Sequence, residues 1–199
     1  MKKQSPIDII PTEALSDGDK NLCLYWKPFE AQLEDTGYLI RAYGHGGYLT
    51  FKKQRFDFVE FHFHTPSEHM INHQKYPMEI HFVHHNQILD HNIVLSVLIE
   101  AVAPSAELQK LTDAFDHIQN SKPITINPKY FLPQQEDIFY YEGSLTVAPC
   151  TENVSWQIFC HSQSASQEQI DSFRALRDNN DRKVHSLCER KVHKTYCQF

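Results

Sequence analysis

Short runs of aromatic and β-branched residues recur along the chain, several of them in alternation with polar residues. Such alternation predicts β-strands, because successive side chains of a strand point to opposite faces. The runs cover residues 39–43, 48–51, 57–64, 78–84, 93–102 and 154–160. We therefore expect a mostly β (α+β) fold. Residues 1–199 should form a single domain with a central, twisted, mainly antiparallel β-sheet and short peripheral helices.

Two segments have the spacing of amphipathic helices instead. Apolar residues recur at spacings of three and four over 106–118, and Ser166 followed by Gln169 resembles a capping box that opens a second helix. We expect both helices to pack on the outside of the sheet. The tail 178–199 is polar, which predicts irregular chain wrapped over the surface.

The overall composition limits the classes of partner. The chain has 199 residues, is 41% hydrophobic and carries a formal net charge of -6 at pH 7. This negative balance, with no basic run, argues against nucleic acid or a membrane as partner and favours a small-molecule substrate, while a homodimer stays open. The start of the chain lacks the apolar core of a signal peptide. We expect a cytoplasmic protein, or a periplasmic or secreted one if the N-terminus was trimmed from an exported precursor.

The cysteines do not predict a disulfide framework. Their number is odd, they are widely spaced and they form no C-x-x-C pair. They are Cys23, Cys150, Cys160, Cys188 and Cys197. We expect free thiols, with a single bridge as the alternative if the chain is exported.

Three histidines stand on two of the predicted strands. His62 and His64 share one face of the strand at 57–64, and His81 lies on the strand at 78–84. If these strands pair, three neutral imidazoles converge on one point, and three histidines with an open fourth position are typical of a catalytic zinc site. Chance remains an alternative, because the chain has 13 histidines and strand histidines often only form hydrogen bonds. Glu60 and Glu79 favour the metal, since ligand imidazoles need a carboxylate or carbonyl at their second nitrogen.

Beyond the histidines, six short motifs occur in a characteristic order. They are Gln4-Ser5-Pro6-Ile7-Asp8-Ile9, Phe61-His62-Phe63-His64, Pro66-Ser67-Glu68-His69, Glu79-Ile80-His81-Phe82-Val83-His84, Gly143-Ser144-Leu145-Thr146 and Val154-Ser155-Trp156. In this order and spacing they resemble the α-class carbonic anhydrase family of bacterial type. The resemblance implies reversible hydration of carbon dioxide to bicarbonate and a proton by zinc-bound hydroxide. The pKa of about 7 that makes hydroxide available at neutral pH is the value known for carbonic anhydrase itself.

The resemblance also implies a role for each matching residue. His62, His64 and His81 would be the zinc ligands. The other matches are Glu68 and Thr146, which orient the hydroxide; Glu79 and Glu60, which hold ligand imidazoles; His69 and Tyr141, a buried polar pair that supports the site; and Val83, Val94, Leu145 and Trp156, an apolar wall for carbon dioxide. Without the resemblance, these four apolar residues would be interpreted as ordinary core.

Proton release is where the chain departs from the family. Tyr38 stands where the fast members carry a shuttle histidine, and tyrosine titrates near 10. His45, in a glycine-rich loop, is an alternative shuttle, although a plain loop residue is the simpler interpretation. Direct proton loss from water of pKa about 7 proceeds at no more than the order of 10³ s⁻¹. We therefore expect slow, buffer-dependent turnover. Glu60 replaces a usual glutamine and should raise the pKa of the zinc-bound water.

Two other functions fit parts of the pattern. His62-x-His64-x-x-x-Glu68 also satisfies the H-x-H-x-x-x-E motif of cupins, which would make Glu68 a ligand of iron or manganese. The second cupin motif, however, is missing around His81. A carbonic-anhydrase-like binding protein without catalysis is the other alternative. Such proteins typically lose a ligand histidine, and all three are present here.

Overall fold

The computed structural model describes residues 2–17, 22–120 and 122–198, and most of its strands belong to one large mixed sheet. Within it, β10 pairs with β11 along one edge and with β7 along the other, which closes eight strands into a barrel. In spatial order the barrel strands are β10 (Met78–Asn86), β11 (His91–Ala101), β14 (Glu152–Phe159), β13 (Asp137–Ser144), β16 (His193–Gln198), β3 (Leu22–Trp26), β6 (Gly47–Phe51) and β7 (Gln54–His64). The barrel pairs are antiparallel except β11 with β14 and β16 with β3, so the predicted mostly β, mainly antiparallel fold is confirmed.

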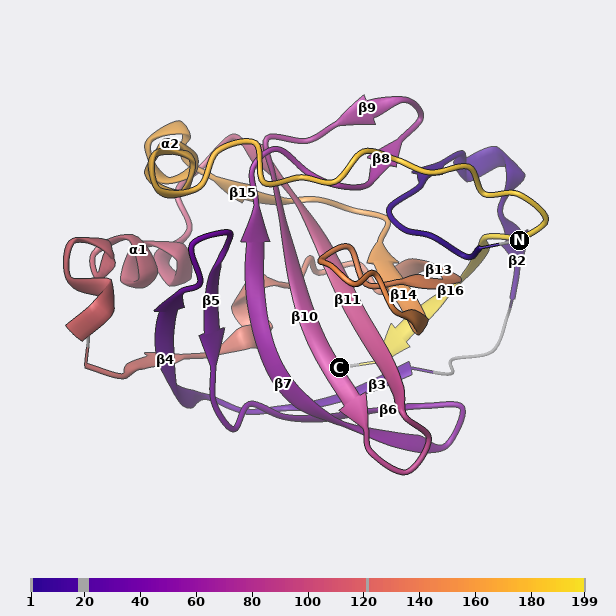
Figure 1. Ribbon diagram of the computed structural model, residues 1–199, viewed down its shortest axis with the longest axis horizontal. Helices are drawn as coiled ribbons and strands as arrows, with labels where there is room; N and C mark the ends of the chain where they lie inside the picture. Colours follow the sequence, from indigo (N-terminus) through magenta and orange to yellow (C-terminus); the bar gives the residue numbers. More distant parts are fainter. Residues whose placement is uncertain (1, 18–21, 121, 199) are drawn as a thin grey trace.

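The remaining strands extend from the barrel. β7 pairs with β6 near its start and with β5 near its end, so β5 begins a branch that continues through β4 to β12. In Figure 1, β4, β5, β7, β10 and β11 fan out across the front of the molecule. The strands outside the barrel are β5 (Ile40–Tyr43), β4 (Phe29–Asp35), β12 (Ile124–Ile126), β15 (Gln163–Ala165), β2 (Leu15–Ser16) and the small sheet of β1 (Asp8–Ile9), β8 (Met70–Ile71) and β9 (Gln74–Lys75).

The alternation of β7 and β10 gives the sheet two different faces. Phe61 and Phe82 point into the larger hydrophobic core, where their rings lie 5.5 Å apart. The opposite face packs against a second, smaller core that includes Val94 and Trp156. The histidine side chains therefore stand on a rigid, doubly packed sheet.

The two α-helices lie together at one end of the sheet (Figure 1). α2 (Gln167–Leu176) begins with the predicted capping box between Ser166 and Gln169. The helix predicted over 106–118 is too long: α1 (Ala106–Thr112) ends early, and a 3₁₀ helix follows at Phe115–Asn120. The Thr112 hydroxyl donates to the carbonyl of Gln109, and a side chain that bonds backbone in this way competes with continued helix. Further 3₁₀ turns lie at Pro11–Glu13 and Pro128–Phe131.

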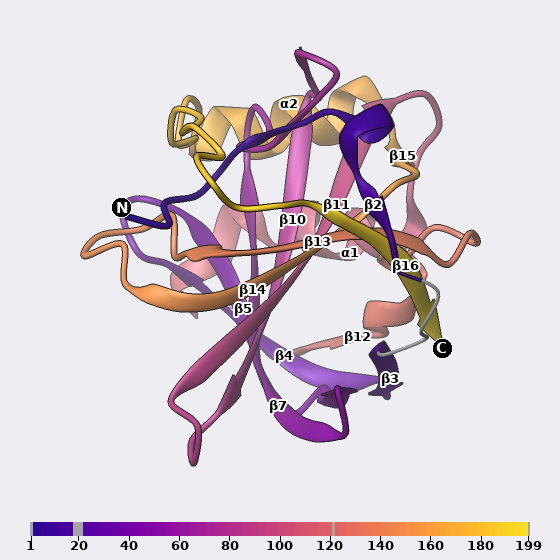
Figure 2. The same cartoon turned by 90° about the vertical axis from the view of Figure 1, so that its right-hand side faces the viewer.

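The prediction of an irregular tail is wrong for its last part. After an irregular stretch, the chain enters the barrel as β16, between β13 and β3, and buries Thr195 and Cys197. The inward residues are small and their neighbours polar, so the strand lacks a clear apolar alternation. Figure 2 shows the irregular stretch before β16 running beside the N-terminal segment, where the His185 amide donates to the Pro6 carbonyl at 2.8 Å. Phe199, the end of the predicted tail, lies outside the described residues.

Two further expectations concern the whole chain. All five cysteines are free thiols in the structure, as the sequence predicts. Among the described residues, no helix combines the length and the apolar character that crossing a membrane requires.

Candidate metal centre

Strand register brings the three histidines together. β7 and β10 are antiparallel, and His62 lies directly opposite His81 while His64 lies opposite Glu79. All three imidazoles are buried, and one ring nitrogen of each lies within 4.8 Å of the others. The paired strands therefore place three nitrogen donors around one point.

The second nitrogen of each histidine has an oxygen partner that fixes the tautomer. His62 Nδ1 lies 2.7 Å from Glu60 Oε1, His64 Nδ1 lies 3.0 Å from the carbonyl of Asn180, and His81 Nε2 lies 2.8 Å from Glu79 Oε1. Carboxylate and carbonyl oxygens only accept, so these nitrogens carry the protons. The other nitrogens, Nε2 of His62 and His64 and Nδ1 of His81, turn lone pairs toward one another.

These lone pairs fit a bound cation. His62 Nε2 and His81 Nδ1 lie only 3.3 Å apart, and the buried His64 Nε2 has no hydrogen-bond partner in the part of the chain that the structure describes. Facing lone pairs repel and an unpaired buried nitrogen is costly, unless a positive ion lies between them. Two nitrogens bound tetrahedrally at about 2.05 Å from zinc are separated by about 3.3 Å, which matches the observed distance. The donor set therefore fits zinc.

Burial also keeps two of these imidazoles, those of His64 and His81, neutral. It lowers the pKa of His64 to about 3 and that of His81 to about 4, although hydrogen bonds to Asn180 and Glu79 act in the opposite direction. A neutral imidazole is the form that binds a metal. His64 and His81 are therefore ready ligands at neutral pH.

Glu79 is the hub of the surrounding hydrogen bonds. Its Oε1 also accepts from the Ser96 hydroxyl at 2.5 Å and lies 2.7 Å from His69 Nδ1, while its Oε2 accepts from the amides of Glu68 and His69. Burial raises the pKa of Glu79, but the adjacent His69 and His81 outweigh it and hold the pKa well below the usual range. His69, Glu79 and His81 also cluster as metal-binding groups would, yet these hydrogen bonds already occupy their facing atoms.

Glu68 and Thr146 lie beside the histidines. Glu68 Oε1 accepts from the Arg182 amide at 2.8 Å, whereas Oε2 lies 3.5 Å from His64 Nε2 and has no hydrogen-bond partner among the described residues. Burial raises the pKa of Glu68, and the nearby His81 and Thr146 partly offset this effect. His69 Nε2 lies 2.8 Å from the Tyr141 hydroxyl, so the two predicted supporting residues are in contact.

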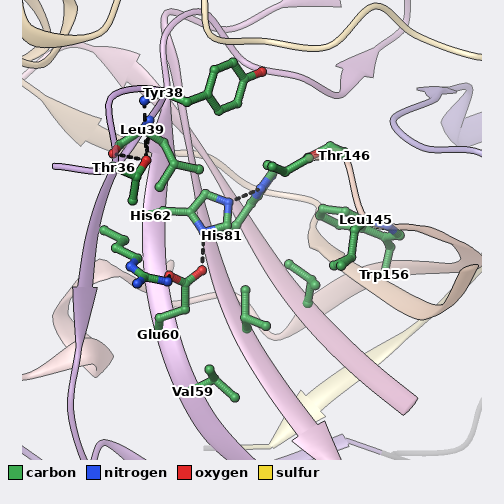
Figure 3. Close-up of a pocket in the computed structure, with 14 residues that line it drawn as sticks. Thr36, Tyr38, Leu39, Val59, Glu60, His62, His81, Leu145, Thr146 and Trp156 are labelled. Carbon is green, nitrogen blue, oxygen red and sulfur yellow. Dashed lines mark hydrogen bonds and ion pairs between the residues drawn. The ribbon is translucent and has the colours of Figure 1, made fainter. Parts of the chain in front are cut away.

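A pocket of about 400 Å³ opens over the histidines. In Figure 3, Glu60 contacts His62 and His62 faces His81, with Thr146, Leu145 and Trp156 on one side. Its wall includes the four apolar residues expected from the sequence, Val83, Val94, Leu145 and Trp156. The pocket thus joins a polar floor to an apolar wall.

Tyr38 lies at the pocket but turns its hydroxyl away from His62 (Figure 3). That hydroxyl donates to the carbonyl of Asn180 at 3.0 Å. Partial burial and the nearby Glu68 raise its pKa above 10. His45, the other candidate shuttle, is exposed and does not line the pocket.

Several contributors to the site have no sequence signal that identifies them. Asn180 and Arg182 face His64 and Glu68 with backbone groups, which carry no mark in the sequence. Ser96 lies directly opposite His81 on β11 and reaches Glu79. Arg41 faces His62 across β5 and β7. Finding Ser96 and Arg41 requires the strand order and register.

Comparison with known proteins agrees with this geometry. A family model described as eukaryotic-type carbonic anhydrase matches residues 1–196. The chain belongs to this family. A carbonic anhydrase of Nostoc sp. is 34% identical over 199 residues, covering 96% of this chain and 75% of the relative. The family and the fold together show that the cupin interpretation is wrong.

Two solved structures are similar over almost the whole chain. The α-carbonic anhydrase of Thermovibrio ammonificans, in complex with the inhibitor sulfanilamide, superposes with a TM-score of 0.89 at 33% identity, covering 96% of this chain and 86% of that one. Dioscorin complexed with ascorbate gives a TM-score of 0.88 at 24% identity, covering 99% and 87%, and shows the shared fold alone.

Proposed function

We propose that this carbonic anhydrase family member binds one zinc ion through His62, His64 and His81 and catalyses the reversible hydration of carbon dioxide. The observation that carries the proposal is the convergence of three imidazole nitrogens at a pocket with an apolar wall. When bound, zinc supplies a Lewis acid that lowers the pKa of a coordinated water to about 7.

The apolar wall binds the substrate. Carbon dioxide is small, neutral and poorly hydrated, so it partitions onto Val83, Val94, Leu145 and Trp156. This wall lines the same pocket as His62 and His81, so it holds carbon dioxide next to the ligands. Bound there, the substrate is positioned before reaction, which is worth several kcal/mol relative to a chance encounter.

Thr146 and Glu68 select which species bind at the floor of the pocket. When Glu68 is ionised it only accepts hydrogen bonds, and its Oε2 has no hydrogen-bond partner among the described residues, so it offers an acceptor to the neighbouring Thr146 hydroxyl. The lone pairs of Thr146 then face the pocket and accept only from a species that carries a proton. This pair thereby favours protonated species at the floor of the pocket.

The test of the proposal combines metal content with activity. We expect one zinc per chain and carbon dioxide hydration by stopped-flow assay, and loss of both in His81→Ala. The control is His85→Ala on the same strand, whose ring lies 2.9 Å from the Asn92 side chain, away from the pocket. Native protein that holds zinc without hydrating carbon dioxide would identify a non-catalytic binding protein. Equal activity in native protein and His81→Ala would refute the proposed ligands.

We further propose that proton release limits turnover. Tyr38, the residue at the expected shuttle position, has a raised pKa and a hydroxyl bound to Asn180, so it is unsuited to accept a proton at neutral pH. The saturating hydration rate should therefore rise with imidazole concentration. An equally high rate in a buffer that cannot accept protons would show that another shuttle operates.

A further inference from the structure

Three charged side chains lie in a row beside His62, and two of them line the pocket wall. Glu34 on β4, Arg41 on β5 and Glu60 on β7 come from adjacent strands, and Arg41 pairs in register with both Glu34 and His62. Arg41 and Glu60 line the pocket, and among its lining residues Arg41 is the one permanent cation.

The Arg41 guanidinium faces both carboxylates. Its Nε and Nη2 donate to Glu34 Oε2 at 2.9 and 2.7 Å, and Nη1 lies 3.8 Å from Glu60 Oε2. The guanidinium also lies 5.8 Å from the Tyr43 ring centroid, which confines its stem. The cation therefore faces the pocket but is masked, and the row has a formal charge of minus one.

This charge matters because the two substrates of the proposed reaction differ in charge. Carbon dioxide is neutral, whereas bicarbonate is an anion, so a wall with a negative balance weakens bicarbonate binding without opposing carbon dioxide. The same negative charge weakens the binding of other small anions that compete for the site. Because Glu34 and Arg41 are each 41% exposed, solvent screens their effect, which limits it to a few-fold.

We propose that the Glu34–Arg41 ion pair is an anion filter that sets how weakly monovalent anions bind in the pocket. The proposal rests on the proposed function only for its biological meaning, since anion binding is measurable without turnover. Removing the Glu34 charge frees the Arg41 guanidinium and brings the formal charge of the row to zero. Removing the Arg41 charge leaves two carboxylates and a formal charge of minus two.

The test measures thiocyanate affinity at one pH and constant, low ionic strength. The probe is the visible spectrum of cobalt-substituted protein, with bicarbonate KM of the zinc enzyme as a second measurement. We expect Glu34→Gln to tighten thiocyanate binding by about two- to fivefold and Arg41→Gln to weaken it by a similar factor. The double variant restores the formal charge of the native row and should return close to the native affinity.

The chain offers a matched control. Arg55 donates to Asp57 Oδ1 through Nε and Nη2 at the same 2.9 and 2.7 Å, but this pair is exposed and does not line the pocket. Asp57→Asn and Arg55→Gln should leave thiocyanate affinity unchanged.

Three outcomes would overturn the filter. Equal effects of Glu34→Gln and Asp57→Asn on thiocyanate affinity would show that only the net charge of the protein matters. An unchanged thiocyanate affinity in Arg41→Gln would show that Arg41 takes no part in anion binding. A double variant as weak as Arg41→Gln would show that Arg41 grips the anion directly. Cobalt protein that binds thiocyanate as expected without hydrating carbon dioxide would contradict the proposed function and leave the filter intact.

Discussion

Glu79→Gln is the sharpest test of how the metal centre is held. The carboxylate accepts from five groups: Oε1 faces His81, His69 and Ser96, and Oε2 faces the amides of Glu68 and His69. An amide keeps one acceptor oxygen and turns an NH₂ toward the donors on the other side, so two or three hydrogen bonds are lost whichever way it sits. Bonds to a buried charge contribute about 1.5–3 kcal/mol each, and breaking a buried charged contact typically costs about 3–5 kcal/mol in total, so we expect a loss of about 3–5 kcal/mol in unfolding free energy.

Urea unfolding of the zinc-free protein measures this loss, and chelator competition measures zinc affinity, which should fall about 10- to 100-fold. Glu60→Gln is the control, because Glu60 makes one hydrogen bond to His62 and the amide oxygen can still accept it. That variant should lose less than about 1 kcal/mol. If Glu79→Gln were no less stable than Glu60→Gln, the idea of Glu79 as the structural hub would be wrong.

Three further substitutions probe stability and turnover. Burial lowers the pKa of His84 to about 3, so the folded protein loses stability as the pH drops below 6.5, the ordinary pKa of histidine. Between pH 7 and pH 5 the unfolding free energy should fall by about 2 kcal/mol for this reason. In urea titrations, His84→Gln should remove this pH-dependent part. The Gln157 side chain is buried with no hydrogen-bond partner in the described structure, so Gln157→Met should raise the unfolding free energy by about 1–2 kcal/mol, and a lower melting temperature would contradict this. Tyr38→His should raise the hydration rate at low buffer concentration and leave the rate at saturating imidazole nearly unchanged.

The parts of the fold that could be predicted are those with a local, periodic signal. The alternation in β7 and β10 predicted two strands with histidines on one face, and the structure shows that these strands pair, in antiparallel orientation. The capping box of α2 is likewise a local pattern, since Ser166 and Gln169 satisfy each other within one turn. The buried face over 106–118 was also predicted correctly, although the helix ends at Thr112.

The parts that could not be predicted depend on contacts between distant segments. β16 is held by backbone pairing to β13 and β3, and its inward residues Thr195 and Cys197 do not mark a strand. The anion filter depends on β4, β5 and β7 being neighbours in a fixed register, which no local pattern of Glu34 or Arg41 specifies.

The metal centre likewise has parts that a local sequence pattern predicts and a part that depends on a distant segment. Glu60 and Glu79 each stand two residues before a proposed ligand histidine, on the same face of the same strand, so the sequence Glu-x-His carries both the proposed ligand and its orienting carboxylate. His64 has no such choice, because the residue two before it is His62, which is itself a ligand. Its second nitrogen therefore takes a backbone carbonyl from Asn180, 116 residues away. The Asn180 side chain holds that carbonyl in place by bonding the backbone of Phe63 and Thr65 on either side of His64. Two ligands are thus oriented by their own strands, and the third is oriented only once the C-terminal segment has docked on β7.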